Sequence, residues 1–166
     1  MKTSKKILLV DDDIDIITVS QSILEKEGYT VISANNKKEA LEKIKSEKPD
    51  LAVLDVMMTT QFEGFELAKE LSENPEIKGI PYLMMTSVEV LVTTNSSVQE
   101  MAREFRKNPK FKDLEVLLVK DIYNGSAGVD YCSGDGRSIW FPVGGFLNKP
   151  VDSKKLVPEV KRLLGE

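Results

Sequence analysis

Ile7-Leu8-Leu9-Val10-Asp11-Asp12-Asp13 is an apolar run that ends directly on three consecutive carboxylates. A second apolar run, residues 51–54, ends on a further carboxylate, Asp55. In an open parallel sheet the carboxyl ends of neighbouring strands face one crevice, so acidic residues that end two such strands can converge on one site. Carboxylates held close together raise one another's pKa unless a cation neutralises them, and a site of oxygen ligands suits hydrated Mg²⁺. The two stretches therefore predict a metal-assisted phosphate site.

The composition is that of a globular chain with one domain, since 41% of the 166 residues are hydrophobic and 30% are charged. The formal net charge is -4 and the basic residues are dispersed, so we expect neither nucleic acid nor a membrane surface as a partner. The single cysteine, Cys132, excludes an intramolecular disulfide, and no apolar run is long enough for a signal peptide or a membrane span. We therefore expect a cytoplasmic protein.

The chain contains no histidine, which excludes histidine-dependent catalytic triads, most zinc sites and acid–base chemistry by imidazole. The chemistry that remains rests on carboxylates, hydroxyls and lysine.

Short apolar runs alternate with longer amphipathic segments, which is typical of a parallel sheet with helices on both faces. Asp13 and Asn36 are the expected N-caps of the first two helices, and Gly28 ends the first. The fourth strand ends on the hydroxyls of Thr86 and Ser87, which would face the same crevice. The expected strands are residues 6–10, 29–34, 51–54, 80–85 and 143–147, and the expected helices are residues 14–27, 36–46, 63–73 and 152–164.

Several short motifs follow one another along the chain, each at the end of an expected strand. They are Leu9-Val10-Asp11-Asp12, Asp50-Leu51-Ala52-Val53-Leu54-Asp55, Thr86, Phe146 and Lys149-Pro150. In this order they resemble the receiver domain of two-component response regulators, over residues 5–90 and 143–166. The resemblance implies a flavodoxin-like, doubly wound α/β fold with a parallel five-stranded sheet in the order 2-1-3-4-5.

The resemblance also implies roles for the acidic residues. Asp55 would be the nucleophile that takes a phosphoryl group to form an aspartyl phosphate. Mg²⁺ would be held by Asp12 directly and by Asp11 through water. Asp55 and the backbone carbonyl of Met57 would complete the protein ligands.

The remaining matching residues imply a switch. Lys149 would donate to one phosphoryl oxygen, and the hydroxyl of Thr86 would donate to another once the phosphoryl group is present. Movement of Thr86 would leave space for Phe146, and this would change the surface that a partner binds.

Two positions depart from the family pattern. Thr59 stands where the loop after the acceptor usually has a proline, and Gly64 lies one residue farther from Asp55 than the pattern places it. In addition, Phe146 has no hydroxyl. A hydrogen bond of the kind that a tyrosine hydroxyl makes could therefore not hold its side chain in an exposed position. The acceptor loop is therefore expected to differ in geometry.

The segment between Thr86 and Phe146 is roughly 40 residues longer than one helix with two loops requires. We assign about residues 107–142 to an insert before the fifth strand. The segment contains an expected helix over 97–107, an apolar run over 114–119 and a hairpin over 132–141, with a turn at Asp135-Gly136. We expect the insert to cover or remodel the face that receivers offer to partners.

The expected function is that of a stand-alone receiver formed by residues 1–166, because the chain ends at its last helix. It would accept a phosphoryl group from a sensor histidine kinase or phosphotransfer protein and signal to an unidentified output protein. It would be a monomer or a weak homodimer, and it would catalyse only its own phosphorylation and dephosphorylation, so it is not expected to be an enzyme otherwise.

Two alternatives remain. One is a pseudo-receiver whose binding of partners does not depend on phosphorylation. The other is a phosphohydrolase similar to the haloacid dehalogenase-like enzymes, because Asp11 and Asp13 have that family's spacing. The second is disfavoured because a helix is expected to start at once and Asp55 would have no role.

Overall fold

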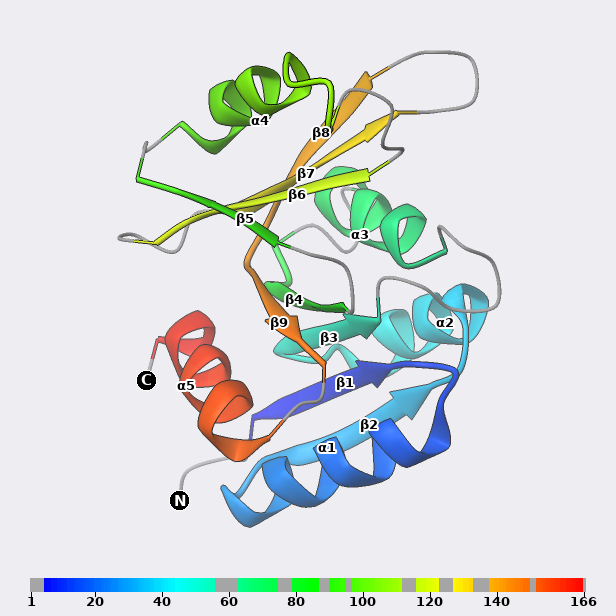
Figure 1. Cartoon of the computed structure of the whole chain (residues 1–166). Helices are drawn as coiled ribbons and strands as arrows, with labels where there is room; N and C mark the ends of the chain where they lie inside the picture. The colour runs from blue at the N-terminus through cyan, green and yellow to red at the C-terminus, as the bar shows by residue number, and fades with distance from the viewer. Residues whose placement is uncertain are drawn as a thin grey trace. The chain divides into compact units, whose positions relative to one another are not determined.

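The computed structural model describes residues 5–55, 63–74, 79–86, 90–94, 97–111, 116–122, 127–132, 138–149 and 152–165. The chain divides into two compact units (Figure 1). The first unit is residues 1–86 with 147–166, and the second unit is residues 87–146.

The first unit is built on a parallel sheet that we call sheet A (Figure 1). Its strands lie in the order β2-β1-β3-β4-β9, which confirms the predicted order with β9 in the fifth place. Asp55 is level with Met85 on the neighbouring strand, so the carboxyl ends of β3 and β4 lie at the same edge. The strands are β1 (Lys6–Val10), β2 (Thr30–Ala34), β3 (Leu51–Asp55), β4 (Tyr82–Thr86) and β9 (Gly145–Asn148).

Four helices surround sheet A, with α1 and α5 on one face and α2 and α3 on the other (Figure 1). The side chains of Asp13 and Asn36 accept hydrogen bonds from backbone N–H groups in the first turns of α1 and α2, which confirms both predicted caps. Gly28 follows α1 with φ +92°, a conformation that glycine adopts without steric cost. The helices are α1 (Ile14–Lys26), α2 (Lys37–Glu47), α3 (Glu63–Glu73) and α5 (Ser153–Leu164).

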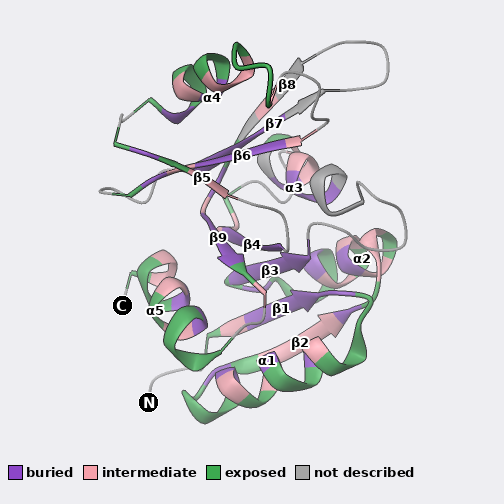
Figure 2. Cartoon of the chain, in the orientation of Figure 1, coloured by how far each residue is buried: buried purple, intermediate pink, exposed green. Residues whose placement is uncertain are grey.

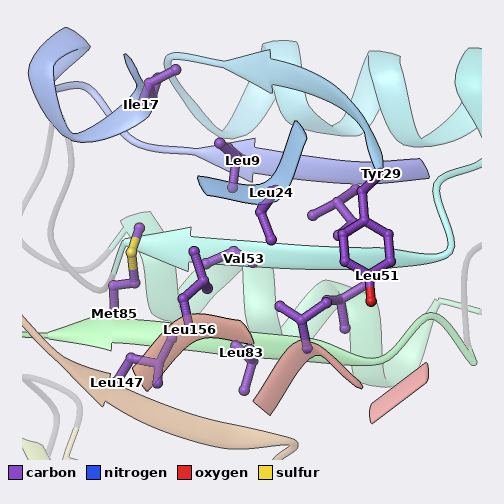
Figure 3. Close-up of a cluster of buried hydrophobic side chains, with 12 residues drawn as sticks. Leu9, Ile17, Leu24, Tyr29, Leu51, Val53, Leu83, Met85, Leu147 and Leu156 are labelled. Atoms are coloured by element: carbon purple, nitrogen blue, oxygen red, sulfur yellow. The ribbon is translucent and has the colours of Figure 1, made fainter. Parts of the chain in front are cut away.

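The main core lies between sheet A and the helices α1 and α5. Leu9, Val53 and Leu83 are level with one another on three neighbouring strands (Figure 3). Leu24 of α1 and Leu156 of α5 pack over this row. The central strands are buried while the outer surfaces of α1 and α5 are exposed (Figure 2), as a sheet covered by helices on both faces requires. This rigid core holds the strand ends in place.

The second unit is built on a separate sheet, sheet B, with the order β5-β6-β7-β8 (Figure 1). Strand β5 is parallel to β6, whereas β6, β7 and β8 are antiparallel neighbours. The amphipathic helix α4 packs on one face through Val98 and Ala102, which contact Leu117 and Val119 of β6. The elements are β5 (Val90–Thr93), α4 (Val98–Arg106), β6 (Val116–Asp121), β7 (Ala127–Cys132) and β8 (Ser138–Val143).

Arg106 connects the end of α4 to β7. Its guanidinium donates to the carbonyl oxygens of Phe111 and Asp130, both at 3.1 Å, and Nε lies 3.6 Å from the Asp130 carboxylate. Asp130 is buried, so its carboxylate loses its hydrating water on folding. The positive charge of Arg106 compensates for that loss. The contacts hold α4 against sheet B.

The structure confirms the predicted helix over 97–107 and the hairpin, which is formed by β7 and β8. The Asp135-Gly136 turn lies outside the described residues. Strand β5 was not predicted, and the second unit covers 87–146, whereas the insert was assigned to about 107–142. Strand β5 pairs with β6 in sheet B and α4 packs against β6, so both elements belong to the second unit.

The expected strand over 143–147 is divided between the two sheets. Val143 is the last residue of β8 and pairs with Ala127 in sheet B, and β9 begins at Gly145 in sheet A. None of the helices that the structure describes has the length and apolar character needed to cross a membrane.

Candidate functional site

The candidate site lies in the first unit, at the carboxyl edge of sheet A. Asp11 follows β1 directly, and Asp55 and Thr86 are the last residues of β3 and β4. Lys149 follows β9. The parallel strands end side by side, so residues from four distant parts of the sequence converge at this edge.

Three carboxylates form a cluster at this edge. Asp11, Asp12 and Asp55 each offer an oxygen, and these oxygens all lie within 4.8 Å of one another. Asp11 is 0% exposed and Asp55 is 5% exposed, whereas Asp12 is exposed to solvent. The cluster is therefore partly buried but open on the side of Asp12.

Lys149 brings a positive charge to the cluster. Its Nζ lies 3.1 Å from Oδ1 of Asp55 and 3.5 Å from Oδ2 of Asp11. The backbone N–H of Lys149 donates to the carbonyl oxygen of Thr86 at 2.9 Å, which fixes the lysine to the end of β4. Thr86 itself is buried. The ammonium group thus lies between two carboxylates, and the backbone of Lys149 is bonded to the end of β4.

Burial dominates the electrostatics of Asp11. It raises the pKa of the Asp11 carboxyl from 3.8 to about 6, although the backbone N–H of Asp13 donates to Oδ1 at 2.9 Å and lowers the pKa. The negative charge of Asp55 raises the pKa further and Lys149 lowers it. A buried carboxylate that costs this much free energy to ionise is a site where a cation would be favourable.

The cluster fits a hard divalent cation. Oδ2 of Asp11 is buried and has no hydrogen-bond partner among the described residues. Lys149 carries one positive charge, against as many as three negative charges on the carboxylates. Carboxylate oxygens are the ligands that Mg²⁺ binds, and an open side leaves room for the water molecules that it retains.

The other predicted residues lie apart from the cluster or outside the described structure. Asp13 is the exposed cap of α1 and is not a member of the cluster, which removes the basis for the phosphohydrolase alternative. Phe146 is buried in β9, and it belongs to the second unit. Met57, Thr59 and Pro150 lie outside the described residues.

Sequence reasoning missed two backbone contacts that shape the site. The hydrogen bond from Asp13 N–H to Asp11 closes an Asx turn, for which the consecutive aspartates were an available signal. The N–H of Asp11 donates to the carbonyl of Ala34 at 3.1 Å, which ties the site to the end of β2. No local pattern could have indicated the second contact, because it joins residues of different strands.

A family model describes the chain as a response regulator receiver domain over residues 7–117. The match takes in Asp11, Asp55 and Thr86, and it ends within β6. Among curated proteins, the chain is 46% identical over 84 residues to the alkaline phosphatase synthesis transcriptional regulatory protein PhoP of Bacillus subtilis. This alignment covers 51% of the chain and 34% of that protein.

A second relative is the transcriptional regulatory protein CpxR homolog of Haemophilus influenzae, which is 42% identical over 82 residues. These residues are 49% of the chain and 34% of the relative. The chain thus spans about a third of the length of both curated relatives.

Solved structures agree in fold. A putative response regulator from Chloroflexus aurantiacus matches with a TM-score of 0.60 and 22% identity, over 99% of this chain and 100% of that one. The chemotaxis protein CheY4 of Vibrio cholerae also matches with a TM-score of 0.60 and 22% identity, over 97% of this chain and 99% of that one. With the matched family model and the order of sheet A, these findings show that the chain belongs to the response regulator receiver domain family.

Proposed function

We propose that this receiver accepts a phosphoryl group on Asp55 from the phosphohistidine of a sensor kinase or phosphotransfer protein. The observation that carries the proposal is the position of Asp55, whose carboxylate lies 3.1 Å from Nζ of Lys149 and beside two further carboxylates. Phosphoryl transfer depends mainly on positioning and on neutralising the charge of the phosphoryl oxygens, and these groups meet both needs.

In the transfer, a carboxylate oxygen of Asp55 attacks the phosphorus atom of the donor. The bond between phosphorus and the donor's imidazole nitrogen breaks, and the nitrogen keeps the electron pair. Lys149 donates to a phosphoryl oxygen, and its backbone bond to Thr86 anchors the lysine at the end of β4, with Nζ beside Asp55.

We propose Mg²⁺ as the cofactor of this reaction. When bound, it supplies positive charge to the phosphoryl oxygens. The groups that would hold it are the carboxylates of Asp11, Asp12 and Asp55 and the backbone carbonyl of Met57.

The proposed switch begins at Thr86. Its buried hydroxyl would donate to a phosphoryl oxygen on Asp55, and this new bond would favour one conformation of the end of β4. Phe146, which is also buried, would change its packing in response. The phosphoryl group would thereby alter a surface that an output protein binds.

The proposed kinase contact is the start of α1. Ile14 directly follows the Asp11-Asp12-Asp13 stretch, and it is 68% exposed. Single exposed apolar side chains are common on protein surfaces, so it is the position of Ile14 next to the acidic cluster that makes it the proposed contact. The two relatives are transcriptional regulators by name, but the net charge of -4 favours a protein partner over DNA for the chain described here.

The test is phosphorylation by acetyl phosphate with and without Mg²⁺, followed by intact-protein mass spectrometry. We expect the mass of one phosphoryl group to appear only with Mg²⁺, and not in Asp55→Asn. The matched control is Asp50→Asn, which removes a carboxylate from the opposite end of β3. A wild-type protein that stays unmodified yet binds its partner would instead establish the pseudo-receiver alternative.

A further inference from the structure

Among the described residues, sheet B has one edge strand with a proline and one, which we call the unprotected edge, with neither proline nor charge. Its edge strands are β5 and β8. Natural sheets guard an edge with a very short strand, charged residues, a bulge, proline or a covering segment, because exposed backbone groups recruit another strand. Strand β8 contains Pro142, which has no N–H to offer to a further strand. Strand β5, with the sequence Val90-Leu91-Val92-Thr93, contains neither a charge nor a proline.

Exposed apolar side chains lie beside the unprotected edge. Val92 is 59% exposed and Ile122, directly after β6, is 53% exposed. Val92 pairs with Lys120 and Leu91 pairs with Val119, so side chains alternate between the two faces along both strands. Leu91 and Val119 face α4, which places Val92 and Ile122 on the opposite face. Among the described residues, β5 pairs only with β6.

We propose that two copies of this chain associate through β5, with the strands antiparallel about a two-fold axis centred on Val92. The axis sets Val92 opposite Val92 of the second copy and Leu91 opposite Thr93 of the second copy. The two B sheets then form one continuous sheet with both α4 helices on the same face. This inference does not depend on phosphorylation of Asp55.

The chemistry of β5 favours a second copy as its occupant. A two-fold axis places identical residues near one another, and like charges directly opposite would destabilise the pair. Since β5 is uncharged, it meets no such repulsion, and the pairing covers the exposed Val92 side chains. A pair of four-residue strands buries less surface than a standard interface, so we expect dimers only at high protein concentration.

The experiment is sedimentation velocity over a range of protein concentrations, with variants at the proposed axis. Wild type is expected to shift from monomer to dimer as concentration rises. Val92→Lys and Val92→Glu are each expected to remain monomeric, because each would place two like charges opposite one another. Val19→Lys is the matched control: Val19 is a 51% exposed valine on α1, and this variant is expected to dimerise as wild type does.

Mixing Val92→Lys with Val92→Glu tests the symmetry directly. Because residue 92 faces residue 92, the mixture is expected to form a heterodimer with opposite charges paired across the axis. Circular dichroism and Trp140 fluorescence establish that each variant is folded. The proposal is wrong if wild type is monomeric at every concentration, if Val92→Lys still dimerises, or if the mixture shows no heterodimer.

Discussion

Asp11 combines two demands that conflict in the absence of a cation. Its side chain is fully buried at the end of β1, yet a carboxylate there is useful to the site only when it is charged. Burial raises its pKa to about 6, so the metal-free protein is destabilised near neutral pH by having to ionise it. Residues that hold a cation are often arranged at the expense of stability in this way.

We predict that Asp11→Asn stabilises the metal-free protein at pH 7 by roughly 1–3 kcal/mol, since one unit of pKa shift corresponds to about 1.4 kcal/mol. The folded-state pKa of about 6 lies above the usual 3.8, so the wild type holds this proton more tightly when folded. Its stability therefore falls as the pH rises from about 4 to about 6. Urea unfolding at several pH values measures the difference.

The gain in Asp11→Asn should vanish below about pH 4, where the wild-type carboxyl is protonated in both states. Asp12→Asn is the control, because this carboxylate is exposed and loses little hydration on folding. An equal gain at low and neutral pH would show that burial of the Asp11 charge is not the cause.

The convergence of the acidic residues could be predicted because it follows from strand ends in a parallel sheet. Asp11 and Asp55 each end an apolar run, and the structure places them side by side. The 2.9 Å bond from Lys149 to Thr86 could not be predicted, since it depends on how two distant strands align. Local sequence patterns carry no information about such an alignment.

At the scale of elements, sequence patterns predicted the helix α4 and the hairpin of β7 and β8, but not that they belong with β5 and β6 to one four-stranded sheet. Val98 and Ala102 form an apolar stripe, and a stripe of this kind does not identify its partner. Strand β5 has only four residues and follows soon after β4, so its sequence did not separate it from the neighbouring loop. Half of sheet B, the hairpin, was therefore predicted, whereas the parallel pairing of β5 with β6 was not.

The close packing of β7 against β8 gives a prediction at this scale. A methyl group on Gly128 would overlap the indole ring of Trp140, including Cε2 at 3.0 Å. Gly128→Ala should therefore destabilise the second unit by about 1–3 kcal/mol through overpacking. Thermal unfolding followed by Trp140 fluorescence measures the loss.

A double-mutant cycle identifies the cause. Trp140→Leu removes the ring, so Gly128→Ala should cost much less in that background than in wild type. This experiment is followed by circular dichroism, because the tryptophan is absent. An equal cost in both backgrounds would show that the indole ring is not what the methyl group meets.

At the scale of the whole molecule, the proposed switch residues stand at the two junctions between the units. Thr86 is the last residue of the first unit before the chain enters the second, and Phe146 is the last residue of the second unit before the chain returns. Both covalent connections of the second unit therefore begin or end at a proposed switch position.

We predict that beryllofluoride with Mg²⁺, a mimic of the phosphoryl group, changes amide exchange in β5 and β9. Only three residues separate Thr86 from β5, so a change at the end of β4 reaches β5 through the backbone. Hydrogen exchange read by mass spectrometry measures the effect, and Asp55→Asn should show none. Changes confined to the segments next to Asp55 would mean that the second unit does not respond.

The division into two units also affects how the sequence of such a protein can change during evolution. Asp11, Asp12, Asp55, Thr86 and Lys149 all belong to the first unit, whereas β5 and its unprotected edge belong to the second. Mutation or exchange within residues 87–144 would therefore leave every residue of the acidic site and all five strands of sheet A unchanged in sequence. New partner-binding surfaces could therefore evolve through mutations in one continuous stretch of the gene, without changes in the codons of the acidic site.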